Sequence, residues 1–178
     1  MKISTFCSLF VVLLLTSTSC KKEPAAEHCF ANTYISQLGT NPLTKAGYID
    51  CFKDIAEYIK AFKSSAENFG LTLQNVKSVT LKPPYPITVT IPASSGFTFA
   101  DFSSAEININ GLKVATMPIG ATGTKIDFMQ TGETDVKSIY FHDHPSSIFN
   151  YVGFKAQTTK AMPSLQIQIQ LTVRGCQL

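Results

Sequence analysis

The most regular hydrophobic pattern lies between residues 48 and 70. Apolar side chains recur there at alternating steps of four and three, with lysines and glutamates between them. This period is typical of one face of an α-helix, and Gly70 offers a natural end to it. Three heptads are too few to favour a coiled coil, so we expect the stripe to pack on its own domain. Its members are Tyr48, Phe52, Ile55, Ile59, Phe62, Ala66 and Phe69.

A shorter series precedes this one. Phe30, Tyr34 and Leu38 are spaced four residues apart and are followed by Gly39, which predicts a first helix. The two helices would form a hairpin around residues 40–42. Residues 29–70 are therefore predicted to be a helical segment.

After Gly70 the pattern changes to short runs of β-branched residues separated by turn-forming residues. In the clearest run, apolar and polar residues alternate strictly from Leu165 to Arg174, which predicts a strand with one buried face. Asn110-Gly111 between two apolar runs predicts a tight β-hairpin. The expected strands lie at 79–81, 87–91, 97–99, 107–109, 112–114, 125–128, 136–141, 148–156 and 165–174.

This number of short strands in the last hundred or so residues is typical of a sandwich. We therefore expect a mainly β fold, with an immunoglobulin-like antiparallel β-sandwich over residues 71–178 preceded by the N-terminal helical segment.

The chain begins with features of an export signal. Met1-Lys2 is followed by an apolar run from Phe6 to Leu15 and by small polar residues before Cys20. A membrane-spanning helix needs about 20 apolar residues, which is twice the length of this run. Residues 1–19 are therefore predicted to be a signal peptide.

The residues Ser17-Thr18-Ser19-Cys20 resemble the lipobox of bacterial lipoproteins, in the looser form found in Bacteroidota. The resemblance implies cleavage before Cys20, lipid on its thiol and palmitate or a similar acyl chain on the new amino group. Several acyl chains would hold the protein firmly to a membrane. The following Lys21-Lys22-Glu23 is similar to half of a surface-export signal, so the outer membrane is expected, with its face left open. Residues 20–28 would be a tether.

Charge and composition narrow the function. The net charge is +3, and it falls to +2 when Lys2 leaves with the signal. So small a charge provides no field that would gather nucleic acid. Arg174 is the only arginine, so bidentate clamps for phosphate are scarce. Nucleic acid is therefore not an expected partner.

Three cysteines remain in the mature chain: Cys29, Cys51 and Cys176. An exported protein meets an oxidising compartment, where disulfides persist. The predicted helical hairpin would bring Cys29 and Cys51 to similar heights, so this pair is favoured over a bridge that involves Cys176. Their spacing does not match a zinc motif.

One motif invites a metal. His142 and His144 are alternate residues, so on a strand they would point the same way and could hold one ion. Further ligands would have to be carboxylates such as Asp101, Glu106 or Asp127. A polar strand end that enters a loop is the favoured interpretation of these histidines, and a metal-assisted hydrolase is the alternative. We expect no cofactor.

Glycan recognition is a second alternative, because flat aromatic side chains with polar neighbours suit it. Tyr85, Tyr140 and Tyr151 are the candidates, although each also suits packing on a sheet. The sequence contains no G-x-S-x-G elbow that would indicate a serine hydrolase. The leading expectation is a non-catalytic module that is lipid-anchored in the cell envelope and binds or scaffolds an envelope protein or glycan.

Overall fold

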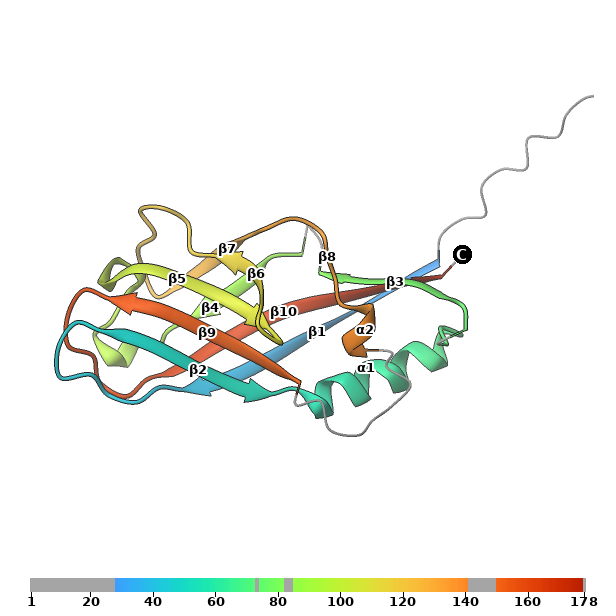
Figure 1. The fold of residues 1–178 in the computed structure, drawn as a ribbon, viewed down its shortest axis with the longest axis horizontal. Coiled ribbons are helices and arrows are strands. Elements are labelled where there is room, and N and C mark those ends of the chain that lie inside the picture. The colour runs from blue at the N-terminus through green and yellow to red at the C-terminus, as the bar shows by residue number, and fades with distance from the viewer. Residues whose placement is uncertain (1–27, 73, 82–84, 141–149, 178) are drawn as a thin grey trace, which may run out of the picture.

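The computed structural model describes residues 28–72, 74–81, 85–140 and 150–177, and within these ranges the chain is mainly β (Figure 1). Two short 3-10 turns, Ala93–Ser95 and Phe99–Asp101, precede the fifth strand. The other elements are β1 (His28–Gly39), β2 (Tyr48–Asp54), α1 (Ala56–Asn68), β3 (Val76–Leu81), β4 (Ile87–Thr90), β5 (Phe102–Ile109), β6 (Leu112–Thr116), β7 (Lys125–Gln130), β8 (Thr134–Asp135), α2 (Lys137–Tyr140), β9 (Tyr151–Thr158) and β10 (Gln166–Gln177).

All the described strand pairs are antiparallel and belong to one hydrogen-bonded sheet. Its order is β2-β9-β5-β6-β7-β4-β10-β3-β8, and β1 pairs with β10 as well. The prediction of a mainly β, antiparallel fold is confirmed. The sheet order does not establish the immunoglobulin-like arrangement that the sequence led us to expect.

The sheet is strongly curved. β7 and β9 are separated by two strands in the sheet order, which would place them about 14 Å apart in a flat sheet. Nevertheless the ring centroids of Phe128 on β7 and Phe154 on β9 are 6.4 Å apart. The sheet therefore bends so that parts of one face meet, and the apolar core fills the space between them.

One antiparallel ladder forms the spine of the molecule. β1 pairs with β10, and β2 pairs with β9. The segment that connects β1 to β2 lies opposite the segment that connects β9 to β10, and an isolated bridge there keeps the same register. In Figure 1, β1 and β10 run alongside each other through much of the length of the fold. Three pairs mark the course of the ladder: His28 with Gln177, Leu43 with Met162, and Asp54 with Tyr151.

The first predicted helix is wrong, because residues 28–39 form strand β1. The side chains of Tyr34, Ser36 and Leu38 are buried, whereas Ile35 and Gln37 between them are exposed. A spacing of four residues fits a helix turn, but it is also twice the two-residue period of a strand. Pairing with β10 along its whole length stabilises this segment as a strand, so the predicted helical hairpin does not form.

The second predicted helix begins later than expected. Tyr48 and Phe52 lie on β2 and are 57% and 60% exposed, so they do not belong to an apolar helix face. The helix α1 covers only Ala56–Asn68, and Gly70 follows it with a φ of 78°, a conformation that glycine adopts easily. Its buried residues are Ile59, Phe62 and Ala66.

Two predicted strands are also wrong. Residues 97–99 lead into a 3-10 turn, because the carboxylate of Asp101 accepts a hydrogen bond from the backbone N–H of Thr98. Within 136–141, residues 137–140 form the short helix α2, where Asp135 accepts a hydrogen bond from the N–H of Lys137. Both carboxylates satisfy a free N–H at the start of a helical turn.

The predicted hairpin and the last strand are confirmed. Asn110 and Gly111 connect β5 and β6 with φ values of 50° and 81°, which suit a type I′ turn. β10 alternates buried and partly exposed residues over its first half, as its sequence indicates.

The predicted disulfide between Cys29 and Cys51 is wrong. Cys29 is bonded to Cys176, its direct partner across the β1–β10 ladder, with the Cα atoms 4.2 Å apart. Cys51 is a buried free thiol on β2. The error follows from the absent helical hairpin, since only that hairpin would have aligned Cys29 with Cys51.

The predicted lipidation site, Cys20, lies outside the described residues. Within the described part, no helix is long and apolar enough to span a membrane.

Candidate functional site

A row of alternating charges crosses the outer face of β2, β9, β5 and β6. The cross-strand register places Asp50 beside Lys155, Lys155 beside Glu106, and Glu106 beside Thr116. The Lys155 ammonium lies 3.8 Å from the Asp50 carboxylate, and the Lys113 ammonium lies 4.0 Å from that of Glu106. All four charged side chains are between 34% and 52% exposed, so their charged ends face solvent.

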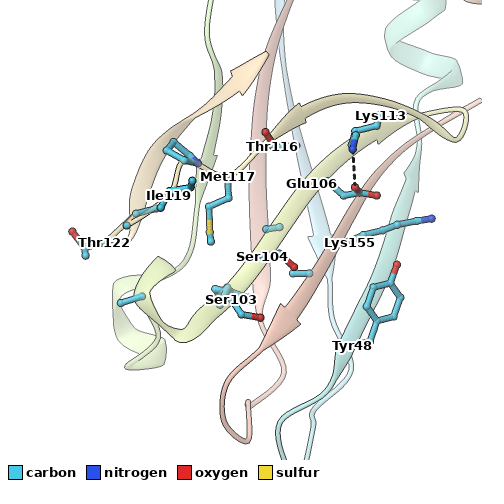
Figure 2. A pocket seen from close by; sticks show the side chains of 17 residues that line it. Tyr48, Ser103, Ser104, Glu106, Lys113, Thr116, Met117, Ile119, Thr122 and Lys155 are labelled. Carbon is cyan, nitrogen blue, oxygen red and sulfur yellow. Dashed lines mark ion pairs between the residues drawn. The ribbon is translucent and has the colours of Figure 1, made fainter. Parts of the chain in front are cut away.

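The segment 117–122 turns this face into a groove. It follows β6 and is held to β5 by the hydrogen bond from the N–H of Met117 to the carbonyl of Ala105, 2.9 Å long. Gly120, with a φ of 74°, allows the tight turn that brings the segment round. Figure 2 shows Met117, Ile119 and Thr122 on one side of the groove and Tyr48 on the other. The groove has a volume of about 750 Å³.

The floor of the groove includes two adjacent serines. The register of β5 shifts between Phe102 and Ser104, and both Ser103 and Ser104 are exposed between buried neighbours. Such a bulge sends two successive side chains to the same face of a strand. Ser104 pairs with Gln157 on β9, which in turn pairs with Tyr48 on β2. The hydroxyl of Ser104 therefore lies two residues along β5 from Glu106 in the charged row.

The groove can therefore supply several kinds of contact at once. Its carboxylate, on Glu106, accepts hydrogen bonds, its ammonium groups donate them, and its hydroxyls do both. Tyr48 adds an exposed aromatic ring, and Met117 and Ile119 add apolar surface. Such a mixture suits the binding of an organic ligand with both polar and apolar parts.

The three tyrosines proposed for glycan binding do not form one surface. Tyr140 is 1% exposed, and its ring centroid lies 5.0 Å from that of Phe62 in the core. Burial raises the pKa of the Tyr140 phenol above its ordinary value, and a nearby tyrosine adds to the shift. Its proposed role as a contact residue is therefore wrong, because the core covers it.

The other two tyrosines lie apart from the groove lining. Tyr151 is half-buried on β9, with its ring centroid 5.7 Å from that of Phe52. Tyr85 precedes β4, and its carbonyl accepts a hydrogen bond from the Gln130 side chain. Tyr85 is 38% exposed.

The proposed metal ligands His142 and His144 lie outside the described residues. The three carboxylates suggested as further ligands each have a different partner. Asp101 forms an ion pair with Lys160, and Glu106 forms one with Lys113. Asp127 accepts a hydrogen bond from Thr88. Among the described residues, no three His, Cys, Asp or Glu side chains are grouped closely enough to hold a metal ion.

Sequence reasoning missed the groove because its residues come from four strands and a loop. Tyr48 was assigned to the apolar face of a predicted helix, so its exposed position on β2 was not expected. One signal was available: Glu106, Lys113 and Thr116 flank the predicted Asn110-Gly111 turn, and hairpin pairing would place them near one another.

Comparisons of this chain with protein-family models, with curated proteins and with solved structures find no match.

Proposed function

We propose that this protein is a lipid-anchored cell-envelope protein whose β domain binds another envelope component without catalysing a reaction on it. The observation that carries the binding role is the groove on the outer face of β2, β9, β5 and β6. It combines a volume of about 750 Å³ with exposed aromatic, charged and hydroxyl side chains. Ligand sites in proteins commonly have volumes of about 300–1,000 Å³ and such convergent polar groups.

The anchor is proposed from the sequence. A short apolar run followed by Ser17-Thr18-Ser19-Cys20 resembles a lipobox, and lipid on Cys20 would keep the domain at a membrane, with the outer membrane as the proposed location. His28, the first described residue, begins β1, so few residues separate Cys20 from the folded domain. β1 then carries the chain to the opposite end of the fold, where β2 begins beside the groove, so the folded domain would hold the groove away from the lipid surface (Figure 1).

We further propose that the curved sheet acts as an immunoglobulin-like β-sandwich module. Support comes from the Phe128–Phe154 contact between β7 and β9, which are separated by two other strands in the sheet order. The chain also turns back between β1 and β2 while the ladder continues through the Leu43–Met162 bridge, as happens when strands pass from one layer to another (Figure 1).

Mass spectrometry of the protein isolated from membranes tests the anchor. We expect the mature chain to begin at Cys20 and to carry diacylglycerol and an additional acyl chain. An unmodified cysteine, or a chain that begins elsewhere, would contradict the anchor but not the binding role.

Hydrogen exchange of the full-length protein tests the binding role. Four probes are compared: neutral oligosaccharides, an acidic polysaccharide, a mixture of unstructured peptides and phospholipid vesicles. We expect at least one probe to slow exchange in β5, β6 and the segment 117–122. The variant Ser104→Arg should abolish this protection by filling the groove, whereas Gln37→Arg on the exposed face of β1 should retain it. The role is wrong if none of the probes protects these segments.

A further inference from the structure

We propose that the ligand of the groove is a neutral oligosaccharide chain, with Tyr48 as the platform for one sugar ring and the charged row as the set of hydrogen-bond partners for its hydroxyls. This inference rests on the proposed binding role of the same groove and names the ligand class.

Charge compensation along the row favours a neutral ligand. Glu106, Lys113 and Lys155 line the groove, and Asp50 lies beside Lys155 just outside the lining. Together the four contribute two negative and two positive charges, and each lies within 4.0 Å of a partner of opposite sign. An anionic ligand would have to approach two carboxylates in order to reach the ammonium groups, and a cation would meet the reverse problem. Each would therefore lose by repulsion part of what it gains by attraction.

Hydroxyl groups match this row better than ions do. A carboxylate only accepts hydrogen bonds and an ammonium only donates them, whereas a hydroxyl does both. A chain of sugar hydroxyls could donate to Glu106 and accept from Lys113 or Lys155 without breaking the charge balance. Hydrogen bonds to charged partners are also stronger than bonds between neutral groups. Ser103, Ser104 and Thr116 add further hydroxyls along the same surface.

The aromatic ring of Tyr48 supplies the apolar part of the site. Its side chain is 57% exposed, and it lies on the opposite side of the groove from Met117 and Ile119 (Figure 2). A sugar ring has one face that presents mainly C–H groups, and such a face packs well on a flat aromatic ring. Ile119, which is fully exposed, leaves apolar surface on the far wall for a second contact.

The open shape of the groove favours a chain over a small enclosed molecule. The side chains of Tyr48 and Lys113, which line it, are both about half exposed. A ligand in such a site keeps one side in water, which suits a polyhydroxyl chain that remains solvated beyond its contacts. The bulge at Ser103 and Ser104 widens the polar floor.

Isothermal titration of the full-length protein tests the proposal. The probes are neutral cello-, xylo- and manno-oligosaccharides of four to six units, with oligogalacturonic acids of the same length as the anionic comparison. We expect at least one neutral series to bind, and to bind more tightly than the acids. Added salt should change its affinity little, because the ligand has no charge to screen.

Variants at two positions separate the contributions. Tyr48→Ala should weaken binding roughly tenfold, while Tyr48→Phe, which keeps the ring, should stay within about twofold of the parent. Glu106→Gln should weaken binding because the amide is a weaker acceptor than the carboxylate. Ile35→Ala, an exposed apolar residue on β1, is the matched control and should bind as the parent does. Circular dichroism confirms that each variant is folded.

The outcomes distinguish the two proposals. If peptides, vesicles or the acidic polysaccharide protect the groove in hydrogen exchange while the neutral oligosaccharides do not bind, the ligand class is wrong and the binding role stands. If neutral oligosaccharides bind but Tyr48→Ala has no effect, the assignment of this groove is wrong. If none of the probes reaches the groove, both proposals fail.

Discussion

Gly175 on β10 packs closely against the aromatic ring of Phe62 on α1. A Cβ atom at position 175 would be 3.1 Å from the Cζ atom of Phe62 and 3.1 Å from a methyl carbon of Leu71. Phe62 itself is fully buried. The absence of a side chain at Gly175 therefore lets the helix approach the strand closely.

Gly175→Ala should destabilise the protein by about 1–3 kcal/mol, because an added methyl group in a tight core forces its neighbours to shift. Urea unfolding followed by circular dichroism measures this loss. In β9, Gly153→Ala is the matched control, since a Cβ there would be 3.6 Å from its nearest neighbour, an ordinary contact distance. Equal losses at both positions would contradict the explanation. In a Phe62→Leu background, Gly175→Ala should have a smaller effect.

The Cys29–Cys176 disulfide joins residues that are 147 positions apart. Loops of this size give large reductions in the entropy of the unfolded chain, and measured effects are typically about 2–4 kcal/mol. Replacement of both cysteines by serine should lower the free energy of unfolding by an amount in that range. Peptide mapping without reductant should find the Cys29–Cys176 bridge, and a Cys29–Cys51 peptide would show that the ladder is wrongly assigned.

Cys51 makes alkaline stability sensitive to pH. Burial, with a contribution from Asp50, raises the pKa of its thiol from 9.0 to about 11. The folded state therefore binds this proton more tightly than the unfolded state does, and the resulting stability is complete below pH 9 and is lost as the pH rises from 9 through 11. The Cys51→Ala variant should show a shallower fall in unfolding free energy over this range. Thiol reagents should label Cys51 slowly at pH 8 and rapidly after unfolding in urea.

Asp101 has the opposite pH dependence. Desolvation opposes the shift, but hydrogen bonds from Lys160 and Thr98 lower the pKa of the Asp101 carboxyl below 3.8. Its contribution to stability is present above that ordinary value and is lost as the pH falls further. Asp101→Asn should cost about 1 kcal/mol at pH 7 and make the acid side of the stability curve shallower. Lys160→Met should reproduce only part of this change, because the bond from the Thr98 N–H remains.

The predictions from sequence succeeded where one local signal had a single interpretation. β10 alternates apolar and polar residues over many positions, and Asn110-Gly111 leaves little choice of turn. The helix α1 was found, although its start was placed eight residues too early, at Tyr48 instead of Ala56. In these segments, the side chains that face the core are also those that the pattern selects.

The wrong predictions have a common cause: the structure of each of these segments depends on which strand pairs with it. Phe30, Tyr34 and Leu38 satisfy a helix and a strand equally well, and only pairing with β10 decides between them. The disulfide error followed from that choice. The groove depends on register between four strands, so neither Tyr48 nor Glu106 could be assigned to it before the sheet order was known.

The continuous ladder has a mechanical consequence for any protein held by its N-terminus. Tension on the residues before His28 would enter β1 at the end where it faces Gln177, and would tend to unzip the two strands pair by pair. The covalent bond between Cys29 and Cys176 lies only one pair further along, so unzipping would stop before it reached the rest of the ladder. Single-molecule pulling from the N-terminus should therefore show a far higher rupture force in the oxidised protein than in the reduced one, and the stress would pass to the covalent backbone of β10.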